Sequence, residues 1–190
     1  MKEKRWKWIF PFTSCLFLIG CIILGAMQIS HNQAKKENEH RYMGHLYVNL
    51  YDLANVWEYF PVESNPVVGA YLVQDALLDI ETDLEDGYRY VSEDVPATAT
   101  WYFVDMASKI NPDTFVLEGG TLSPEGRDFY TQLSQDMTRL CAPLVGEDQV
   151  NFDHNLNMVA FKDIFLDFYN EYEAKKWNQQ VGPSDIPYKK

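Results

Sequence analysis

The chain has 190 residues, and its 28 Asp and Glu against 16 Lys and Arg give a formal net charge of −12 at pH 7. The imbalance grows to −15 beyond residue 30, because residues 1–30 carry four of the cations and one of the acids. Such an acidic surface repels nucleic acid and anionic lipid headgroups, so we exclude nucleic-acid binding. The remaining stretch of about 160 residues is long enough for one domain with its own core.

The first predicted element is an apolar run over residues 8–29, which follows a short basic tip at residues 1–7. As a helix of 22 residues this run would be about 33 Å long, enough to cross a hydrocarbon core of about 30 Å. Lys and Arg precede it and no full charge follows it closely, so the tip is expected in the cytoplasm. We predict a single-pass signal-anchor in the cell membrane, with the lipid bilayer as partner and the bulk of the chain outside the cytoplasm.

A second interpretation of this segment rests on the stretch Leu18-Ile19-Gly20-Cys21. It resembles the lipobox of bacterial lipoproteins, in which a Leu, two small or aliphatic residues and a Cys end a short apolar segment. The resemblance implies cleavage and lipid attachment at Cys21. Apolar residues nevertheless continue beyond Cys21, where a lipidated chain has no use for them. We favour the uncleaved anchor and keep lipidation and ordinary signal-peptide cleavage as alternatives.

Residues 30–182 are predicted to form an all-α antiparallel bundle of four long helices and one short helix, followed by a loose tail at 183–190. In the first two helices, over 39–60 and 66–95, apolar residues recur at steps of three and four and define one face. In the first helix these residues are Met43, Leu46, Leu50, Leu53, Trp57 and Phe60. In the second they are Val73, Leu77, Ile80, Leu84 and Val91.

Proline residues and their neighbours mark the expected helix starts. Asn65-Pro66 and Ser123-Pro124 each place a capping side chain before a proline of the first helical turn. The helix after Ser123 is expected to bury Phe129, Leu133, Met137 and Leu140.

The remaining segments are assigned from shorter patterns. A short helix over 98–110 is expected to turn Trp101, Val104, Ala107 and Ile110 inward. The segment NPDTFVLEGGTL that follows is predicted to be an extended loop, because a lone strand has no partner. The last helix is expected to start at residues 153–155 and to bury Met158, Phe161, Phe165, Phe168 and Tyr172.

Aromatic residues of the first and third predicted helices form the candidate contact surface. They cover more than one helix face, so some of them are expected to lie outside the core. Such side chains are candidates for a protein partner or for the lining of a ligand groove. The candidates are Tyr47, Tyr51, Tyr59, Trp101 and Tyr102.

The second helix carries a candidate weak cation face at Asp79, Asp83 and Asp86. Alternating acids resemble the start of an EF-hand loop, but the glycine needed at its sixth position is absent. A solvated acidic helix face is therefore the simpler interpretation, and we predict no dedicated metal site there.

Other residues of chemical interest also have simple structural interpretations. Glu37-x-x-His40 has the spacing of a di-iron helix element, but the nearest second copy, 151–154, lacks the Glu. Ser123 is a helix cap, and Cys141 lies near a helix C-terminus, where the dipole disfavours a thiolate. We predict no catalytic residue, metal site or cofactor.

Cys141 is the one cysteine beyond residue 30, and the chain has no Asn-x-Ser/Thr sequon. Both features fit a bacterial envelope protein better than a eukaryotic secreted one. The sequence identifies no specific function. We expect a membrane-anchored, non-enzymatic helical protein with an interaction or assembly role and a protein partner. The alternative is a ligand- or cation-binding sensory module that acts through a partner, and an enzyme comes third.

Overall fold

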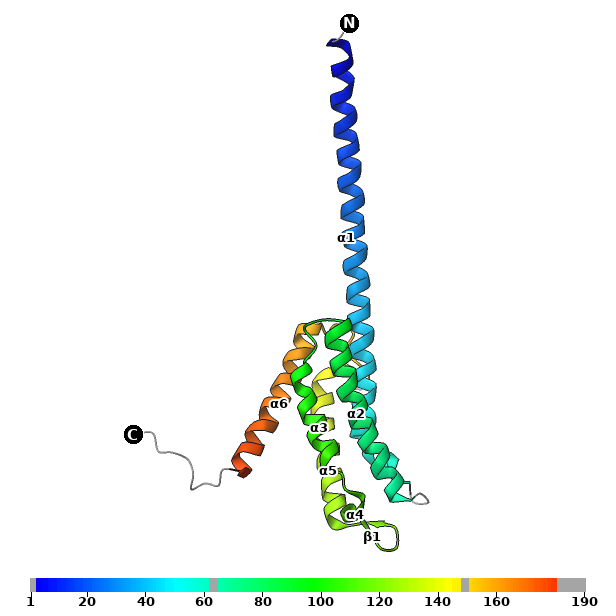
Figure 1. Ribbon diagram of the computed structural model, residues 1–190, viewed down its shortest axis with the longest axis vertical. Coiled ribbons are helices and arrows are strands. Elements are labelled where there is room, and N and C mark those ends of the chain that lie inside the picture. Colours follow the sequence, from blue (N-terminus) through cyan, green and yellow to red (C-terminus); the bar gives the residue numbers. More distant parts are fainter. Residues whose placement is uncertain (1–2, 62–64, 148–150, 181–190) are drawn as a thin grey trace, which may run out of the picture. The chain divides into compact units, whose positions relative to one another are not determined.

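The computed structural model describes residues 3–61, 65–147 and 151–180, and the side chains of residues 17–61, 65–147 and 151–176. This part of the chain is mostly helical, so the all-α prediction is confirmed (Figure 1). The helices are α1 (Glu3–Ala54), α2 (Pro66–Tyr90), α3 (Thr100–Lys109), α4 (Pro112–Phe115), α5 (Pro124–Cys141) and α6 (Met158–Gln180). Short 3-10 turns cover Val56–Tyr59 (η1), Ala97–Ala99 (η2) and Ala142–Leu144 (η3).

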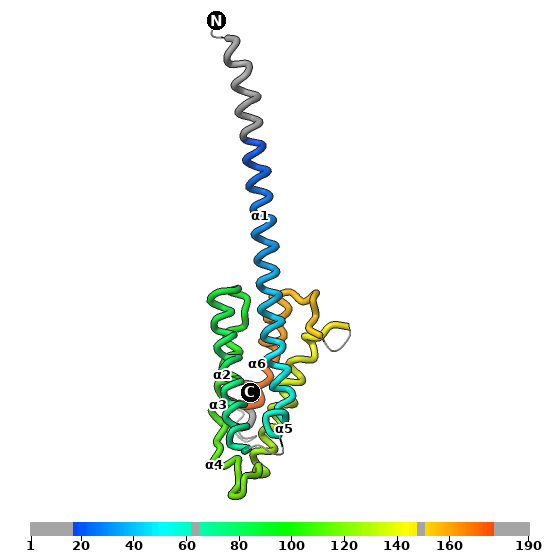
Figure 2. The backbone as a smooth tube through the Cα atoms, turned by 90° about the vertical axis from the view of Figure 1, so that its right-hand side faces the viewer, coloured from blue at the N-terminus to red at the C-terminus, as the bar shows by residue number. Residues whose placement is uncertain are grey.

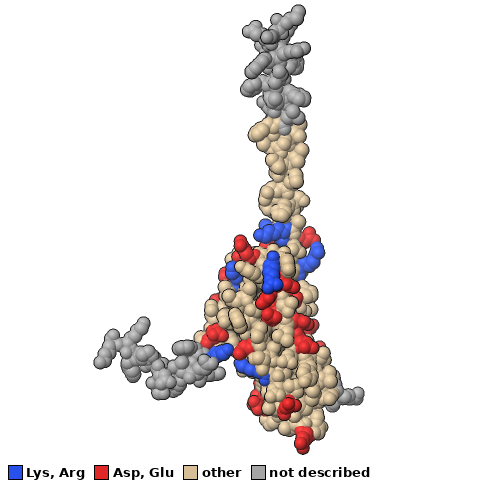
Figure 3. All heavy atoms as spheres, viewed as in Figure 1, with Lys and Arg blue, Asp and Glu red and all other residues tan. Residues whose placement is uncertain are grey.

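The chain divides into two compact units, residues 1–38 and 39–190, and α1 contributes to both. In the first unit the large apolar side chains between residues 17 and 29 are all exposed, each by 53% to 73%. Figure 3 shows this part of α1 without charged side chains.

Among the residues whose side chains are described, no helix is long and apolar enough to cross a membrane. The side chains of residues 8–16, which belong to the predicted anchor, are not among those described. The predicted tail at 183–190 lies outside the described residues. The membrane anchor therefore stays a prediction.

The core of the second unit forms where the second half of α1 meets α2, α3, α5 and α6. Figures 1 and 2 show α2 and α3 side by side. The core faces predicted for the four long helices are confirmed through most of their length. Their buried members are Met43, Leu46, Leu50 and Leu53 in α1, Val73, Leu77, Ile80 and Leu84 in α2, Leu133, Met137 and Leu140 in α5, and Met158, Phe161, Phe165 and Phe168 in α6.

Two helix starts follow the predicted capping chemistry. The Asn65 side chain accepts a hydrogen bond from the Val67 amide at 3.0 Å, and the Ser123 hydroxyl accepts one from the Gly126 amide at 3.1 Å. Each cap satisfies an amide that has no partner within its helix.

The first predicted helix ends earlier than expected. Helix α1 stops at Ala54, and η1 follows, so Trp57 is 43% exposed instead of lying on the core face. The Asn55 side chain donates to the Tyr51 carbonyl at 3.0 Å and satisfies a group at the helix end. Pro61 also disfavours helical geometry at the residue before it.

The face predicted for the short third helix is confirmed at Ala107 and Ile110 and was wrong at its first residue, Trp101, while Val104 is half-buried. Trp101 is 66% exposed, whereas Tyr102 and Phe103 are buried together with Ala107 and Ile110. Apolar residues occupy almost every position between 101 and 107, so two neighbouring faces fit the pattern. Packing selects the face that carries Tyr102. The centroid of the Tyr102 ring lies 4.8 Å from the ring centroids of both Phe168 and Tyr172 in α6.

The segment predicted as an extended loop contains a helical turn and a small hairpin. After α4, strand β1 (Val116–Leu117) pairs in antiparallel register with β2 (Thr121–Leu122). Gly119 and Gly120 close the hairpin with positive φ angles of 106° and 75°, which glycine adopts without strain. The strand therefore has a partner, a few residues further along the chain.

The last helix begins at Met158, later than predicted. The Asp153 carboxylate instead accepts a hydrogen bond from the Asn155 amide at 2.8 Å, which makes a turn. Asn157 caps α6 by accepting a hydrogen bond from the Ala160 amide at 3.0 Å. A backbone bond from the Asp153 amide to the Leu144 carbonyl, 2.8 Å long, keeps the preceding segment out of the helix.

Two helical glycines give opposite predictions for the same substitution. A Cβ at Gly69 would lie 2.5 Å from the Tyr59 carbonyl oxygen, whereas a Cβ at Gly44 would meet its nearest neighbour at 3.9 Å. We expect Gly69→Ala to lower the free energy of unfolding by about 1–3 kcal/mol through overpacking. Gly44→Ala should raise it by about 0.5–1 kcal/mol, because alanine favours the helix. Urea unfolding followed by circular dichroism of the full chain in detergent would measure both, and equal effects would contradict this packing.

Candidate ligand-binding cavity

A cavity of about 350 Å³ lies between α3, α5 and α6. Figure 1 shows α6 inclined to α3 and α5, with its C-terminal end turned away from them. The side chains around the cavity are of two kinds, apolar and charged. They are Met106, Lys109, Phe129, Gln132, Leu133, Asp136, Arg139, Tyr172, Lys175 and Lys176.

The apolar part of the lining belongs to the hydrophobic core. Met106 and Leu133 are buried, and Phe129 of α5 is half-buried and packs against the core, with ring contacts to Phe115 and Tyr130. The periodicity of α3 and α5 places these side chains on the core face of each helix. The cavity thus has an apolar wall on the core side.

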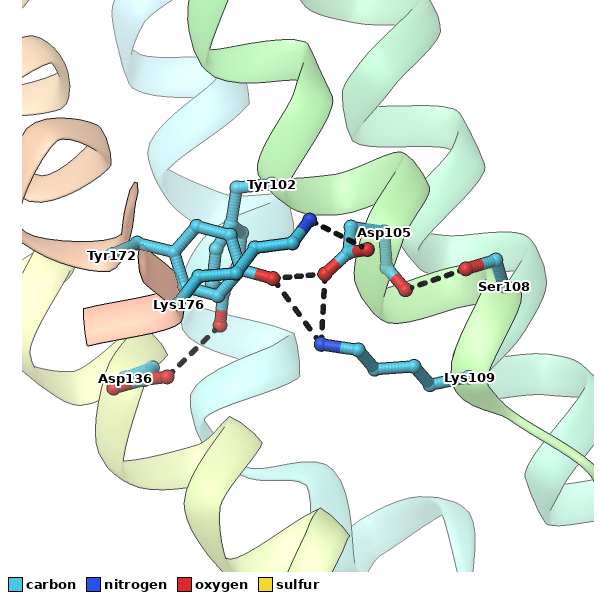
Figure 4. A network of polar contacts seen from close by, with 7 residues as sticks. All are labelled: Tyr102, Asp105, Ser108, Lys109, Asp136, Tyr172 and Lys176. Carbon is cyan, nitrogen blue, oxygen red and sulfur yellow. Dashed lines mark hydrogen bonds and ion pairs between the residues drawn. The ribbon is translucent and has the colours of Figure 1, made fainter. Parts of the chain in front are cut away.

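Asp105 holds the polar side of the cavity together (Figure 4). Its carboxylate lies 2.7 Å from Lys109 Nζ and 3.2 Å from Lys176 Nζ, and it accepts a hydrogen bond from the Tyr172 hydroxyl. Lys109 Nζ also donates to the Tyr172 oxygen at 3.2 Å. One carboxylate therefore links α3 to two residues of α6.

The electrostatics of this cluster favour an ionised Asp105. Burial by itself would raise the pKa of the carboxyl group, but hydrogen bonds from Lys109, Tyr172 and Lys176 and the charge of Lys109 lower it to about 2. The pKa of Tyr172 is raised, first by burial and then by its hydrogen bond to Asp105. At neutral pH the pair is thus a phenol donating to a carboxylate.

Asp136 organises a second polar group on α5. The buried Tyr102 hydroxyl donates to its carboxylate at 3.2 Å, and the Gln132 amide donates at 3.1 Å. Arg139 lies 3.8 Å from the same carboxylate and 2.7 Å from Glu171 of α6. Burial, followed by the charge of Asp136, raises the pKa of Tyr102, so Tyr102 also remains a hydrogen-bond donor.

These protonation states suit recognition more than proton transfer. A general acid or base works best with a pKa near the working pH, whereas Asp105 and the two tyrosines are shifted away from neutrality. Burial likewise raises the pKa of the Cys141 thiol to about 12, so it stays protonated. The cavity therefore presents fixed charges, fixed donors and an apolar wall.

The predicted aromatic surface is divided between core and surface. Tyr47 and Tyr102 are buried, because the bundle uses them as core residues, so neither belongs to an exposed surface. Tyr51 is 50% exposed, and its ring centroid lies 6.0 Å from that of Tyr47, while Tyr59 is half-buried at the end of η1. Trp101 is exposed on α3, and the hydroxyl of its neighbour Tyr102 donates to Asp136, which lines the cavity.

The predicted cation face is also divided. Asp79 and Asp86 are exposed, but Asp83 is half-buried and faces α1. The Asn49 amide donates to the Asp83 carboxylate at 2.8 Å, and His45 lies 3.7 Å from it. Among the described residues no group of three or more His, Cys, Asp and Glu is arranged to hold a metal ion.

The two motifs compared with di-iron elements do meet in space. His40 Nε2 lies 2.7 Å from His154 Nδ1, and Phe152 packs against the His40 ring with centroids 5.3 Å apart. The contact ties α1 to the segment before α6. Cys21, the candidate lipidation residue, is exposed in the first unit.

The residues that build the cavity were not predicted from the sequence. A usable signal was the spacing of opposite charges and polar partners along single helices, such as Asp105 with Lys109 and Asp136 with Arg139. Such pairs also occur on ordinary exposed helix faces, so the spacing does not identify a cavity. Comparison with known proteins gives no match to this chain, whether by family model, by sequence or by solved structure.

Replacing Asp105 by Asn should destabilise the bundle in a pH-dependent manner. Because the carboxyl pKa is lowered to about 2 in the folded chain, its stabilisation is complete above its unfolded pKa and disappears as pH falls through the folded pKa. We expect Asp105→Asn to lower the free energy of unfolding by about 1–2 kcal/mol at pH 7, after discounting for solvent screening. Urea unfolding at pH 7, 5, 4, 3 and 2 should show this difference shrinking below pH 4.

The matched control for this prediction is Asp163→Asn, which changes an exposed acid of α6. Its effect at pH 7 should stay within about 0.5 kcal/mol. A difference between wild type and Asp105→Asn that grew toward pH 2 would contradict the assignment of Asp105 as an ionised anchor.

Proposed function

We propose that this chain is a membrane-anchored extracytoplasmic module of the bacterial envelope that binds a small ligand and acts through a protein partner. The observation that carries the proposal is the cavity between α3, α5 and α6, which combines an apolar wall with convergent charged groups. A volume of about 350 Å³ lies at the lower end of the range, about 300–1,000 Å³, that small-molecule sites occupy.

The anchor is supported by the first unit. Apolar side chains from Phe17 to Ile29 are exposed around α1 without an interposed charge. An exposed apolar surface of this kind is unfavourable in water, and a lipid bilayer would remove it from water. The basic residues at 1–7 favour an orientation in which residues 39–190 lie outside the cytoplasm.

A second candidate function, an interaction or assembly role without a ligand, is favoured by the outer face of α2. Val68, Tyr71 and Leu72 lie on one side of its first two turns, and each is 47% to 52% exposed. Apolar side chains grouped on one helix face are a common feature of protein–protein contacts. In the ligand-binding proposal, the same face is the place where the partner docks.

The ligand-binding proposal predicts that filling the cavity abolishes binding without unfolding the bundle. Gln132 is an exposed residue of the lining, whereas Gln135 is exposed on the same helix and does not line the cavity. Small molecules from a cell extract would be detected by ligand-observed NMR against the full chain in detergent. We expect Gln132→Trp to remove the signals of bound molecules and Gln135→Trp to keep them. Binding that survives in both variants would place the ligand elsewhere.

The membrane-anchor proposal makes a specific prediction for the intact mass of the chain and for its association with membranes. An uncleaved chain keeps residues 1–20, and Cys21→Ser should change neither its membrane association nor its processing. Leu24→Arg, in the exposed apolar run, should weaken membrane association, because arginine in a spanning helix costs about 2.5–3.5 kcal/mol. Carbonate extraction and intact-mass measurement would test both. A mass gain from lipid at Cys21 that disappears in Cys21→Ser would establish the lipoprotein instead.

A further inference from the structure

Positive charge is scarce in the bundle and concentrated at the cavity. Residues 39–176 contain eight Lys and Arg against 25 Asp and Glu. Four of these eight cations line the cavity: Lys109, Arg139, Lys175 and Lys176. Asp136 is the one acid among the described lining residues. The cavity is thus a cationic site in a strongly acidic domain.

Acids near the cavity offset its cations in number but do not pair with all of them. Asp105, Asp136 and Glu171 pair with Lys109, Lys176 and Arg139, and the charge of Glu173 also acts on Tyr172. Within the described part of the chain no carboxylate forms an ion pair with Lys175. The cavity therefore keeps a cation that no carboxylate engages.

The lysines also retain donor capacity. An ammonium group has three N–H donors. In the described structure, Lys109 Nζ contacts Asp105 and the Tyr172 oxygen, while Lys176 Nζ contacts Asp105. Both amines lie close to the Tyr172 ring, 5.6 Å and 5.8 Å from its centroid. They are held beside the cavity with N–H groups left for an incoming acceptor.

Another part of the cavity lining is apolar. Met106 and Leu133 are buried, and Phe129 adds an aromatic ring. A ligand that only neutralised the lysines would leave this wall in contact with water. An apolar group attached to the anion would cover this wall and remove its surface from water, which is favourable.

We infer that the ligand of this cavity is a small organic anion, with its carboxylate or phosphate beside Lys109, Lys176 and Arg139 and its apolar body against Met106, Phe129 and Leu133. The inference rests on the proposed ligand-binding function and specifies the ligand class. The cavity volume of about 350 Å³ suits a small organic acid and not an intact phospholipid with two acyl chains.

The test uses three small probes of similar size, namely benzoate, phenyl phosphate and the neutral benzamide. Binding to the full chain in detergent would be followed through ¹³C-labelled methionine methyl groups, with Met106 as the cavity reporter and the buried Met43 as the internal control. We expect both anions to saturate the Met106 shift in about the millimolar range and benzamide to bind about tenfold more weakly. Raising the salt concentration should weaken the anions alone.

Two lysines of α6 make a matched pair of variants. Lys176 contacts Asp105 and Lys162 contacts Asp94, each at 3.2 Å, but Lys176 lines the cavity and Lys162 does not. Lys176→Met should weaken anion binding about tenfold, since a charge-assisted hydrogen bond is lost. Lys162→Met should change it less than about twofold.

The outcomes separate this inference from the proposed function. Equal binding of benzamide and the two anions at Met106, abolished by Gln132→Trp, would overturn the anion inference and leave the ligand-binding function intact. No shift of Met106 with any probe, together with no bound molecules from cell extract, would overturn both. Equal losses in Lys176→Met and Lys162→Met would show that the cavity cations do not select the ligand.

Discussion

The shared carboxylate of Asp105 is the interaction on which the cavity depends. Two ammonium groups and a phenol converge on it from α3 and α6. Without the carboxylate, Lys109 and Lys176 would face each other as like charges, and the wall between the two helices would lose its order. One acid thus serves two cations in the contact that joins the helices.

Regular helices were predictable because their core faces repeat over many turns. In α2 the residues Val73, Leu77, Ile80 and Leu84 are all buried, so tertiary packing and local pattern agree. Helix α3 has ten residues, apolar at most positions, and its face is decided by which aromatic rings it meets. The strands of the hairpin at 116–122 are too short to show an alternating pattern. Its two glycines are the sequence feature that indicates a reversal of chain direction there.

Little of the site was predictable, for a different reason. Its residues come from three helices separated by long stretches of chain, and each local pair resembles a surface ion pair. Tyr102 illustrates the difficulty, because its sequence neighbourhood suggests an exposed aromatic, whereas its ring is buried and its hydroxyl reaches Asp136. Whether a tyrosine becomes a core residue or a site residue depends on the helix that packs against it. The sequence of one segment does not identify that helix.

The contrast between acidic surface and cationic cavity has a physical consequence for selectivity. In physiological salt the field of an exposed charge decays over about 8 Å, so the negative surface acts on a ligand mainly during its approach. Large polyanions remain in contact with that surface and are repelled, whereas a small anion that enters the cavity is surrounded by Lys109, Lys175, Lys176 and Arg139. In the proposed binding mode, distance decides the balance, because an anion in contact with the lysines is close to them and further from the screened acids of the surface. The acidic composition would then disfavour large polyanions more than a small anion.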